Sequence, residues 1–491
     1  MNVDDYLLNC LRELKRPLVA SAAQGWEYAA RIDRPFLWDS TDHQNSAPAQ
    51  GLPKDTLRKT IQFGNSSELQ PRSTESLLDD LLNLVRNDPD RALFHIEKLC
   101  NTSAPELFLD NYFSLGLNQF YKDISDFFRK KIIIFGAGPV GLSFANMIKQ
   151  KRPDLDIYMI EKRIYQSGFK KRYTRNWATH LPHSIYADRI DSRVSELFKI
   201  AGNDHYIGGK IYIIESLLLL SCKENGVRFI FDELDYKKLC ATAKSAVFFD
   251  ATGGRLVSAT HTLRSKDYQI PIQNVTLASP NLKEGHRGHG IQTQYMSDNF
   301  DVQISQNGST LTPTLDNVSI QSSMFKLTGI RVRYYNAIME YVKEINNDNR
   351  FYIWPGQIHQ SENEILILIN ISQKEYQIFQ TIIQEKLTLD ALYDQLKTQD
   401  KSVIDSRLIE FLKFLGKSCQ ETEPEIFAEP AFIYKPYFRD IWNYEVNLHG
   451  RKVVPLGDSI FTGHPKVGNG LGSHLQIAYY LCDKVDGALG M

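Results

Sequence analysis

A glycine-rich segment near residue 136 constrains the fold of this chain more than any other feature. The apolar run 132–135 is typical of a buried strand, and the hexapeptide Gly-Ala-Gly-Pro-Val-Gly follows it directly at 136–141. Residues 142–150 then have the composition of a helix. In this context Gly136 permits a tight turn, and Gly138 lets the backbone approach a pyrophosphate. Gly141 lets the helix pack closely against the strand.

A second apolar run, residues 157–160, predicts the next strand and completes a strand–helix–strand unit. Glu161 follows it, where a carboxylate would accept hydrogen bonds from the ribose of a dinucleotide. The start of the intervening helix would supply N–H groups and a positive dipole to the phosphates. These features predict a dinucleotide site on a parallel α/β sheet, but they do not separate NAD from FAD.

The C-terminal segment indicates which dinucleotide is bound. Gly457-Asp458 follows the apolar run 453–456, and Pro465, Gly468 and Gly470 come next, before a predicted helix. This order resembles the Gly-Asp motif and the Pro-x-x-Gly-x-Gly stretch of the class A flavin monooxygenases. The resemblance implies that Asp458 hydrogen-bonds the ribitol chain of FAD. It also implies that the following helix begins against the flavin ring, where its dipole stabilises negative charge.

A third segment, Phe-Phe-Asp-Ala-Thr-Gly-Gly at 248–254, is similar to the strand-then-Ala-Thr-Gly element that many FAD proteins place beside the cofactor. Class A hydroxylases usually have an Asp-Gly pair there, which serves both FAD and the nicotinamide cofactor. Gly253 stands where that Asp would lie. This departure weakens the expectation that NADPH is used in the class A manner. A separate NADPH domain is not indicated either, because the sequence has no second GxGxxG motif.

Among class A enzymes the sequence most resembles the MICAL monooxygenase domain, over roughly residues 130–490. The segment 161–181 contains an Arg-Asn pair ahead of a His-Leu pair, as in MICAL enzymes, where these residues lie near the flavin. The usual Arg of the Leu-rich helix is absent, and Ile214 and Glu215 occupy its neighbourhood. MICAL enzymes use NADPH and oxygen to oxidise methionines of actin, but these motifs do not carry that substrate over.

The predicted cofactor contacts fall on all of these segments. They are Gly136, Gly138, Pro139, Val140, Gly141, Glu161, Lys162, Arg163, Arg175, Gly253, Asp458, Pro465, Gly468, Asn469, Gly470 and Leu471. His464 and His180 are the candidate catalytic residues, with a structural role as the alternative for each. Arg163 and Arg175 are either partners of the phosphates or flavin ring, or surface arginines. No metal site is expected, because the glycines of 285–290 oppose the helix that His286 and His289 would need to converge.

The pattern along the chain predicts a Rossmann-like α/β fold with an inserted antiparallel sheet. Residues 1–128 form a helical N-terminal extension, either a packing element or a module that binds a protein partner. Residues 129–255 form the first part of the FAD-binding domain, and 256–375 a β-rich substrate domain. Residues 376–491 contain a helical segment and the C-terminal part of the FAD-binding domain.

Bulk properties narrow the class of protein. The chain has 491 residues and a net charge of −1, so it offers no broad electrostatic footprint for nucleic acid or an anionic membrane. Its 6 cysteines show no CxxC spacing, which favours a reducing compartment over a disulfide framework. An acidic N-terminus and the lack of a long apolar run predict neither a signal peptide nor a membrane span. We therefore expect a cytoplasmic protein.

The sequence thus predicts a flavoprotein oxidoreductase, an FAD-dependent monooxygenase that uses NADPH or NADH. The resemblance implies that reduced FAD adds oxygen as a flavin hydroperoxide, which oxygenates a small molecule or a protein side chain. One alternative is another FAD enzyme: an oxidase, a reductase or a halogenase-like protein, although the halogenase Trp-x-Trp-x-Ile-Pro signature is missing. A second alternative is a flavoprotein whose helical N-terminal region acts mainly in protein binding.

Overall fold

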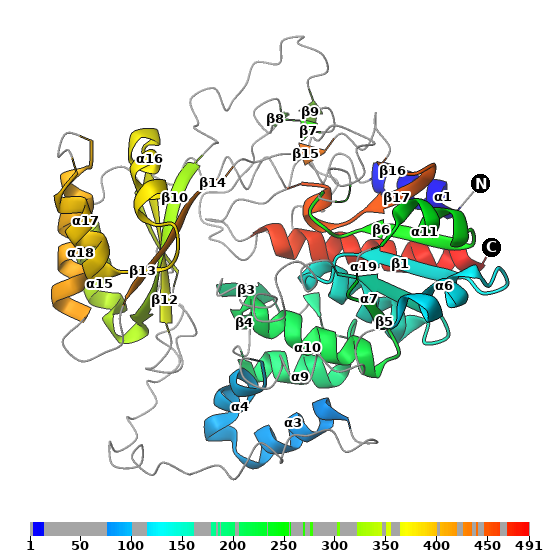
Figure 1. Cartoon of the computed structure of the whole chain (residues 1–491). Helices are drawn as coiled ribbons and strands as arrows, with labels where there is room; N and C mark the ends of the chain where they lie inside the picture. The colour runs from blue at the N-terminus through cyan, green and yellow to red at the C-terminus, as the bar shows by residue number, and fades with distance from the viewer. Residues whose placement is uncertain are drawn as a thin grey trace. The chain divides into compact units, whose positions relative to one another are not determined.

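The computed structural model divides into two compact units, each described separately (Figure 1). The parallel-sheet unit holds the described residues up to 304 and from 438 onward, and the antiparallel-sheet unit holds those from 322 to 434. The structure describes residues 3–13, 76–100, 115–161, 178–182, 185–186, 188–201, 206–232, 234–254, 256, 269–270, 275–277, 302–304, 322–345, 350–354, 364–399, 403–419, 426–434, 438–439, 446–461 and 469–490.

A six-stranded sheet with the order β16-β17-β6-β1-β2-β5 forms the centre of the parallel-sheet unit. All neighbours in it are parallel except β16 and β17. Every residue of β1 is buried, as expected for a strand covered on both faces. The strands are β1 (Lys131–Phe135), β2 (Asp156–Ile160), β5 (Arg228–Ile230), β6 (Ala246–Asp250), β16 (Val446–Leu448) and β17 (Arg451–Pro455).

Helices cover both faces of this sheet. On one face Phe144 of α7 (Pro139–Lys151) packs edge-on against Phe249 of β6. On the other, Phe120 of α6 (Leu117–Ser125) meets Tyr158 of β2, and α11 (Tyr236–Thr242) contacts β16. The α7 helix also packs against α10 (Ile211–Glu224) and α19 (Asn469–Gly490). The predicted α/β class with a parallel sheet is confirmed.

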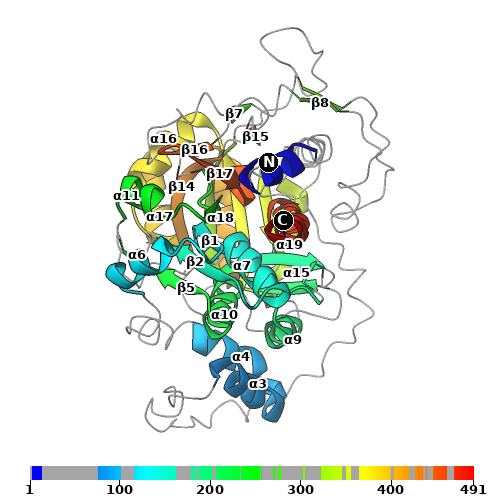
Figure 2. The same cartoon turned by 90° about the vertical axis from the view of Figure 1, so that its right-hand side faces the viewer.

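The described helices of the N-terminal region pack against this unit. Helix α1 (Val3–Glu13) lies beside α19 and β17 and buries Leu7 and Leu11 (Figure 2). Helices α3 (Leu77–Asn87) and α4 (Ala92–Lys98), joined by the 3-10 turn Pro89–Arg91, contact α9 (Ser192–Ala201).

Three short antiparallel pairs also belong to the parallel-sheet unit. They are β3 (Ala178–Pro182) with β4 (Tyr206–Lys210), β7 (Gln269–Ile270) with β15 (Phe438–Arg439), and β8 (Val275–Leu277) with β9 (Val302–Ile304).

A five-stranded antiparallel sheet with the order β11-β12-β10-β14-β13 organises the second unit. Its helices share one apolar core with the sheet, in which Phe325 stacks on Phe379 at 4.5 Å between ring centroids. The strands are β10 (Ser322–Arg331), β11 (Phe351–Trp354), β12 (Glu364–Ile371), β13 (Leu387–Thr388) and β14 (Phe427–Tyr434). The helices are α15 (Tyr335–Ile345), α16 (Gln373–Ile382), α17 (Leu389–Lys397) and α18 (Ser406–Cys419), with the 3-10 turn Val332–Tyr334 before α15.

The two units group the chain differently from the four predicted segments. The sequence predicts a boundary between residues 375 and 376, but helices α16 to α18 belong to the antiparallel-sheet unit. The physical reason is that β14, which follows these helices, pairs with β10. The helices between them therefore complete the core of this unit.

A buried ion-pair network holds the antiparallel-sheet unit together. Arg350 Nη2 lies 2.6 Å from Glu375 Oε1, and Arg350 Nη1 lies 2.7 Å from Asp405 Oδ2. Glu375 also caps α16, since its Oε2 accepts a hydrogen bond from Ser372 N. The arginine thus neutralises a carboxylate that is only 2% exposed.

We predict that Arg350→Met lowers the free energy of unfolding of this unit by about 3–5 kcal/mol, because it strands a buried carboxylate. Urea unfolding measures the change. The control is Lys397→Met, which removes an exposed pair with Asp394 and should change stability by no more than about 0.5 kcal/mol. Equal effects of the two substitutions would contradict the prediction.

Candidate functional site

The glycine loop between β1 and α7 lies between the ends of β2 and β6, the two strands that flank β1. Gly136 N donates to Ile160 O at 2.8 Å, and Ala251 N donates to Phe135 O at 2.8 Å. Gly136 has a φ of +97°, and a Cβ added to it would lie 2.7 Å from Ala251 O. A side chain at this position would therefore collide with backbone as well as strain the turn.

The other two glycines of the loop differ in the space around them. A Cβ at Gly141 would lie 2.2 Å from Gly136 O, so this residue permits close packing of α7. A Cβ at Gly138 would meet nothing nearer than Glu215 Oε1 at 3.8 Å. Gly138 is also the N-cap residue of α7, and it makes no side-chain cap hydrogen bond. Its position leaves room for a phosphate to approach the helix N-terminus.

Glu161 lies against the same loop. Its side chain is buried, and its Oε2 accepts a hydrogen bond from Ala137 N at 2.9 Å. Its backbone N–H donates to Ile230 O at 3.0 Å, which fixes the residue at the end of β2. The carboxylate is thus held beside the glycine loop, as the ribose-binding prediction requires.

The segment after β6 and the turn after β17 meet beside the N-terminus of α7. Leu456 N donates to Asp250 O at 2.8 Å, and Gly254 N donates to Ser459 Oγ at 2.8 Å. A Cβ at Gly253 would lie 3.5 Å from Asp458 Cβ. The 3-10 turn η10 (Gly457–Ser459) therefore places Asp458 beside the segment that follows β6.

Gly457 joins this turn to the glycine loop. It has a φ of +60°, and a Cβ there would lie 3.3 Å from Val140 Cβ. Because Val140 belongs to the first turn of α7, the structure brings three predicted segments together: the loop at 136–141, the segment at 251–254 and the turn at 457–459.

Two buried ionisable residues of this region were not predicted as site residues. Glu215 of α10 places its carboxylate near Gly138, as described above, and it is 0% exposed. His474 of α19 lies with Nδ1 3.4 Å from Asp458 Oδ1. The sequence signal for Glu215 is a carboxylate within the otherwise largely apolar run 211–220, whereas His474 has no comparable signal, because Ser473 and Gln476 stand beside it in a mixed segment.

Burial lowers the pKa of His474, while the charge of Asp458 and the carbonyl of Phe461 oppose this shift.

Several predicted site residues lie outside the described residues: Lys162, Arg163, Arg175, His464, Pro465 and Gly468. The segment with His286 and His289 also lies outside them. His180 is in β3, opposite Gly208 of β4, and Asn469, Gly470 and Leu471 begin α19. Over the described ranges, no group of His, Cys, Asp or Glu could hold a metal ion, and no helix is long and apolar enough to cross a membrane.

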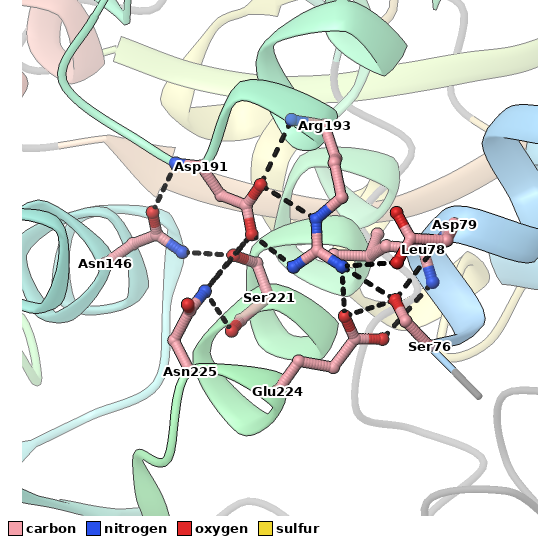
Figure 3. Close-up of polar contacts among 9 residues, drawn as sticks. All are labelled: Ser76, Leu78, Asp79, Asn146, Asp191, Arg193, Ser221, Glu224 and Asn225. Atoms are coloured by element: carbon pink, nitrogen blue, oxygen red, sulfur yellow. Dashed lines mark hydrogen bonds and ion pairs between the residues drawn. The ribbon is translucent and has the colours of Figure 1, made fainter. Parts of the chain in front are cut away.

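A network of hydrogen bonds and ion pairs connects α7 to the helices around it (Figure 3). Asn146 of α7 accepts a hydrogen bond from Asp191 N at 2.9 Å and donates one to Ser221 Oγ at 2.6 Å. Arg193 pairs with Asp191 at 2.6 Å and with Glu224 at 2.8 Å. Since Arg193 also donates to Ser76 Oγ at the start of α3, the network joins α3, α7, α9 and α10.

Burial raises the pKa of Asp191, but hydrogen bonds and charge from Arg193 outweigh it and hold the pKa below its ordinary value. A carboxyl whose folded pKa is lowered stabilises the fold above its unfolded pKa of about 3.9. That contribution is lost as the pH falls through the folded value.

We predict that the unfolding free energy lost in Asp191→Asn is greatest above about pH 4 and shrinks below it. The measurement is urea unfolding of wild type and variant across this range. Asp80→Asn, exposed on α3, serves as the control and should differ from wild type by a small amount at every pH. A deficit in Asp191→Asn that stays constant down to the lowest pH would refute the assignment.

No protein-family model and no curated protein matches the sequence. Among solved structures, the chain is similar to a flavoprotein/dehydrogenase from Cytophaga hutchinsonii, with a TM-score of 0.37 and 9% identity, over 73% of this chain and 79% of that one.

Two further solved structures are similar to the chain at the same level. One is 2-methyl-3-hydroxypyridine-5-carboxylic acid oxygenase, with a TM-score of 0.37 and 13% identity, over 74% of this chain and 85% of that one. The other is p-nitrophenol 4-monooxygenase from Pseudomonas putida, with a TM-score of 0.36 and 9% identity, over 72% of this chain and 79% of that one.

Proposed function

We propose that this chain is an FAD-dependent oxidoreductase of the monooxygenase type that uses NADPH or NADH and oxygen. One observation carries the proposal: the glycine loop, the segment 251–254 and the turn 457–459 converge at the carboxyl ends of β1, β6 and β17. In open parallel sheets this edge is where nucleotide ligands bind.

The residues that converge there suit the parts of FAD. The open face of Gly138 and the N-terminus of α7 would take the pyrophosphate. Glu161 would accept hydrogen bonds from the adenosine ribose. The side chain of Asp458 is 60% exposed, so its carboxylate is available to the ribitol hydroxyls. The start of α19 at Asn469 would stabilise negative charge at the ring.

Glu215 is the one residue described here that does not suit the phosphates of FAD. A phosphate that approaches Gly138 would come near a buried carboxylate, whereas cationic or neutral donors suit phosphates better. The open space at Gly138 and the helix N-terminus still fit the cofactor, so the departure bears on how tightly it is held.

When bound, FAD would supply hydride acceptance from the nicotinamide and activation of oxygen. The chain would bind and orient it and exclude water from the reaction. A small molecule or a protein side chain is the proposed substrate class, with the antiparallel-sheet unit as the proposed substrate domain. The helices α3 and α4 are proposed as a contact for a protein partner.

The absorbance of the purified protein before and after anaerobic NADPH tests the proposal. We expect a flavin spectrum that bleaches on NADPH addition and returns with oxygen. A colourless protein that cannot be reconstituted with FAD would refute the flavin site. A flavin that NADPH and NADH both fail to reduce would refute the monooxygenase reaction while leaving the flavin site intact.

We predict that Gly138→Ala weakens FAD binding by at least about tenfold, because the methyl group fills the space that the pyrophosphate needs. The fold should tolerate it, since the added Cβ meets only Glu215 Oε1 at 3.8 Å. Titration with FAD and urea unfolding separate the two effects.

Two other glycines serve as controls for Gly138→Ala. Gly487→Ala on α19 has open space and should leave FAD affinity unchanged. Gly136→Ala should destabilise the fold itself, because its Cβ would collide with Ala251 O. If Gly138→Ala binds FAD as tightly as wild type, the phosphate is not at this loop.

We predict that Glu215→Gln binds FAD at least about tenfold more tightly than wild type, since it removes a negative charge beside the phosphate position. Flavin fluorescence during titration measures the affinity. Glu196→Gln, whose carboxylate pairs with Arg86 on the surface, is the matched control and should not change it. Weaker binding in Glu215→Gln would show instead that the carboxylate holds a group that the cofactor needs.

A further inference from the structure

Two exposed aromatic residues stand next to each other in the turn 126–130 between α6 and β1, here called the aromatic turn. Phe127 is 70% exposed and Phe128 is 95% exposed. Among the described residues, the other large hydrophobic residue that is exposed is Phe94 on α4, at 45%. A single exposed apolar residue is ordinary on a protein surface, whereas contiguous exposed apolar surface marks a site of interaction.

Hydrogen bonds from a buried lysine fix the shape of the aromatic turn. Lys131 is 1% exposed, and its Nζ donates to Asp126 O and, at 2.8 Å, to Arg129 O. Ser245 Oγ donates to Arg129 O at 3.2 Å, and Phe128 N donates to Asp126 Oδ1 at 2.9 Å. The turn is thus held on both sides of the two phenylalanines, which reduces the entropy lost when they bind.

Exposed basic side chains lie beside this turn. Lys122 is in the last turn of α6, and Arg129 belongs to the aromatic turn itself. Lys244 precedes Ser245, whose hydroxyl contacts the turn. The side chain of Arg129 is 70% exposed, and its nitrogens lie 3.7 Å from Asp156 Oδ2 and 3.9 Å from Asp126 Oδ2. Such long, exposed ion pairs leave the guanidinium able to meet a second anion.

The carboxylates on the neighbouring strand and helix are less exposed than these cations. Asp123 Oδ2 lies 2.6 Å from Arg228 Nη1, and Asp156 Oδ1 lies 3.5 Å from Arg228 Nη2. The side chains of Asp123 and Asp156 are only 18% and 17% exposed. The charge presented to solvent around the aromatic turn is therefore positive, although the chain as a whole has a net charge of −1.

The aromatic turn lies at the amino ends of the parallel strands. It leads directly into β1, and Lys130 Nζ donates to Leu489 O near the end of α19 (Figure 1). The glycine loop and the turn η10 instead follow the carboxyl ends of β1 and β17. Anything that docks on the aromatic turn thus meets the edge of the sheet opposite to the proposed cofactor site.

The exposure and charge of this surface favour a lipid bilayer over a protein pocket. Side chains as exposed as Phe127 and Phe128 project into solvent, so their partner has to admit two protruding rings. A bilayer interface does this without a preformed pocket, and aromatic rings are enriched at that depth. Anionic head groups would then meet the basic side chains beside the rings.

We propose that the aromatic turn is a peripheral anchor for an anionic lipid bilayer. Phe127 and Phe128 enter the interfacial region of the bilayer, and Lys122, Arg129 and Lys244 contact the head groups. Two rings and three cations give weak, reversible binding, unlike the insertion of a membrane-spanning helix. The anchor does not depend on the proposed flavin site.

Sedimentation of the full-length protein with vesicles tests the anchor. The vesicles contain phosphatidylcholine with about 30% phosphatidylserine, and vesicles of phosphatidylcholine alone are the comparison. We expect wild type to bind the anionic vesicles more tightly. Binding should fall at least about tenfold when Phe127→Ser and Phe128→Ser are combined, because the apolar rings are lost. Phe94→Ser is the matched control and should bind as wild type does.

The charge contribution is tested with a second pair of variants. Lys122→Gln combined with Lys244→Gln should weaken binding to the anionic vesicles at least about fivefold and leave binding to phosphatidylcholine unchanged. Lys199→Gln, exposed on α9, is the control and should have no effect. Added salt should also weaken binding of wild type.

A tryptophan in place of one ring reports directly on insertion. The chain has 5 tryptophans, so the signal is the difference between Phe128→Trp and wild type. We expect the added emission to shift to the blue on anionic vesicles and to be quenched by brominated acyl chains. Phe94→Trp should show neither change. This readout decides the question even where the double serine variant is unstable.

The outcomes separate the anchor from its rivals. Wild type that stays in the supernatant, a double serine variant that binds as tightly as wild type, or an unshifted Phe128→Trp would overturn the anchor. A dimer that the double serine variant abolishes, without vesicle binding, would identify a second copy as the partner and overturn it as well. A protein that binds vesicles but no FAD would refute the proposed function and leave the anchor standing.

Discussion

The close approach of two backbone segments, Gly136 against Ala251, is the contact on which the rest of the candidate site depends. A Cβ at Gly136 would lie 2.7 Å from Ala251 O, so this approach exists only because glycine occupies the loop. It lets the chain leave β6 directly beside the loop, with Ala251 N hydrogen-bonded to Phe135 O. From there Gly253 reaches Asp458, and Gly457 packs on Val140 at the start of α7. The absence of a side chain at Gly136 thus allows three segments that are distant in sequence to meet.

The sequence could predict the parts of this site that are formed by residues close together in the chain. The strand before Gly136, the helix after it and the acid at Glu161 follow one another within a single supersecondary unit, and the structure has β1, α7 and β2 there. The arrival of Asp458 beside Gly253 has no local signal. The resemblance to known flavoenzymes implied only that each of the two segments lies beside FAD, and the contact between them follows from the pairing of β17 with β6.

The parts that sequence could not predict depend on contacts between distant segments. Helical periodicity after residue 373 was visible, but not that β14 would return to pair with β10 and so enclose these helices in the antiparallel-sheet unit. Glu215 and His474 were missed for a related reason. Each is a buried ionisable residue, and only the packing of α10 and α19 against α7 decides that its side chain lies at the site and not in a satisfied core.

The described site sorts hydrogen-bond donors and acceptors by position. Backbone N–H groups gather at the loop and the start of α7, where phosphates would lie, and carboxylates stand where hydroxyl groups would lie, at Glu161 and Asp458. The described loop segments bring carboxylates and no cationic side chain to these positions. They would therefore bind FAD through hydrogen-bond geometry and fixed dipoles more than through net charge. Glu215 is the exception to this arrangement, because it places a hydrogen-bond acceptor beside the proposed phosphate position. A binding site that tolerates such a group gives up part of its affinity for an anionic ligand.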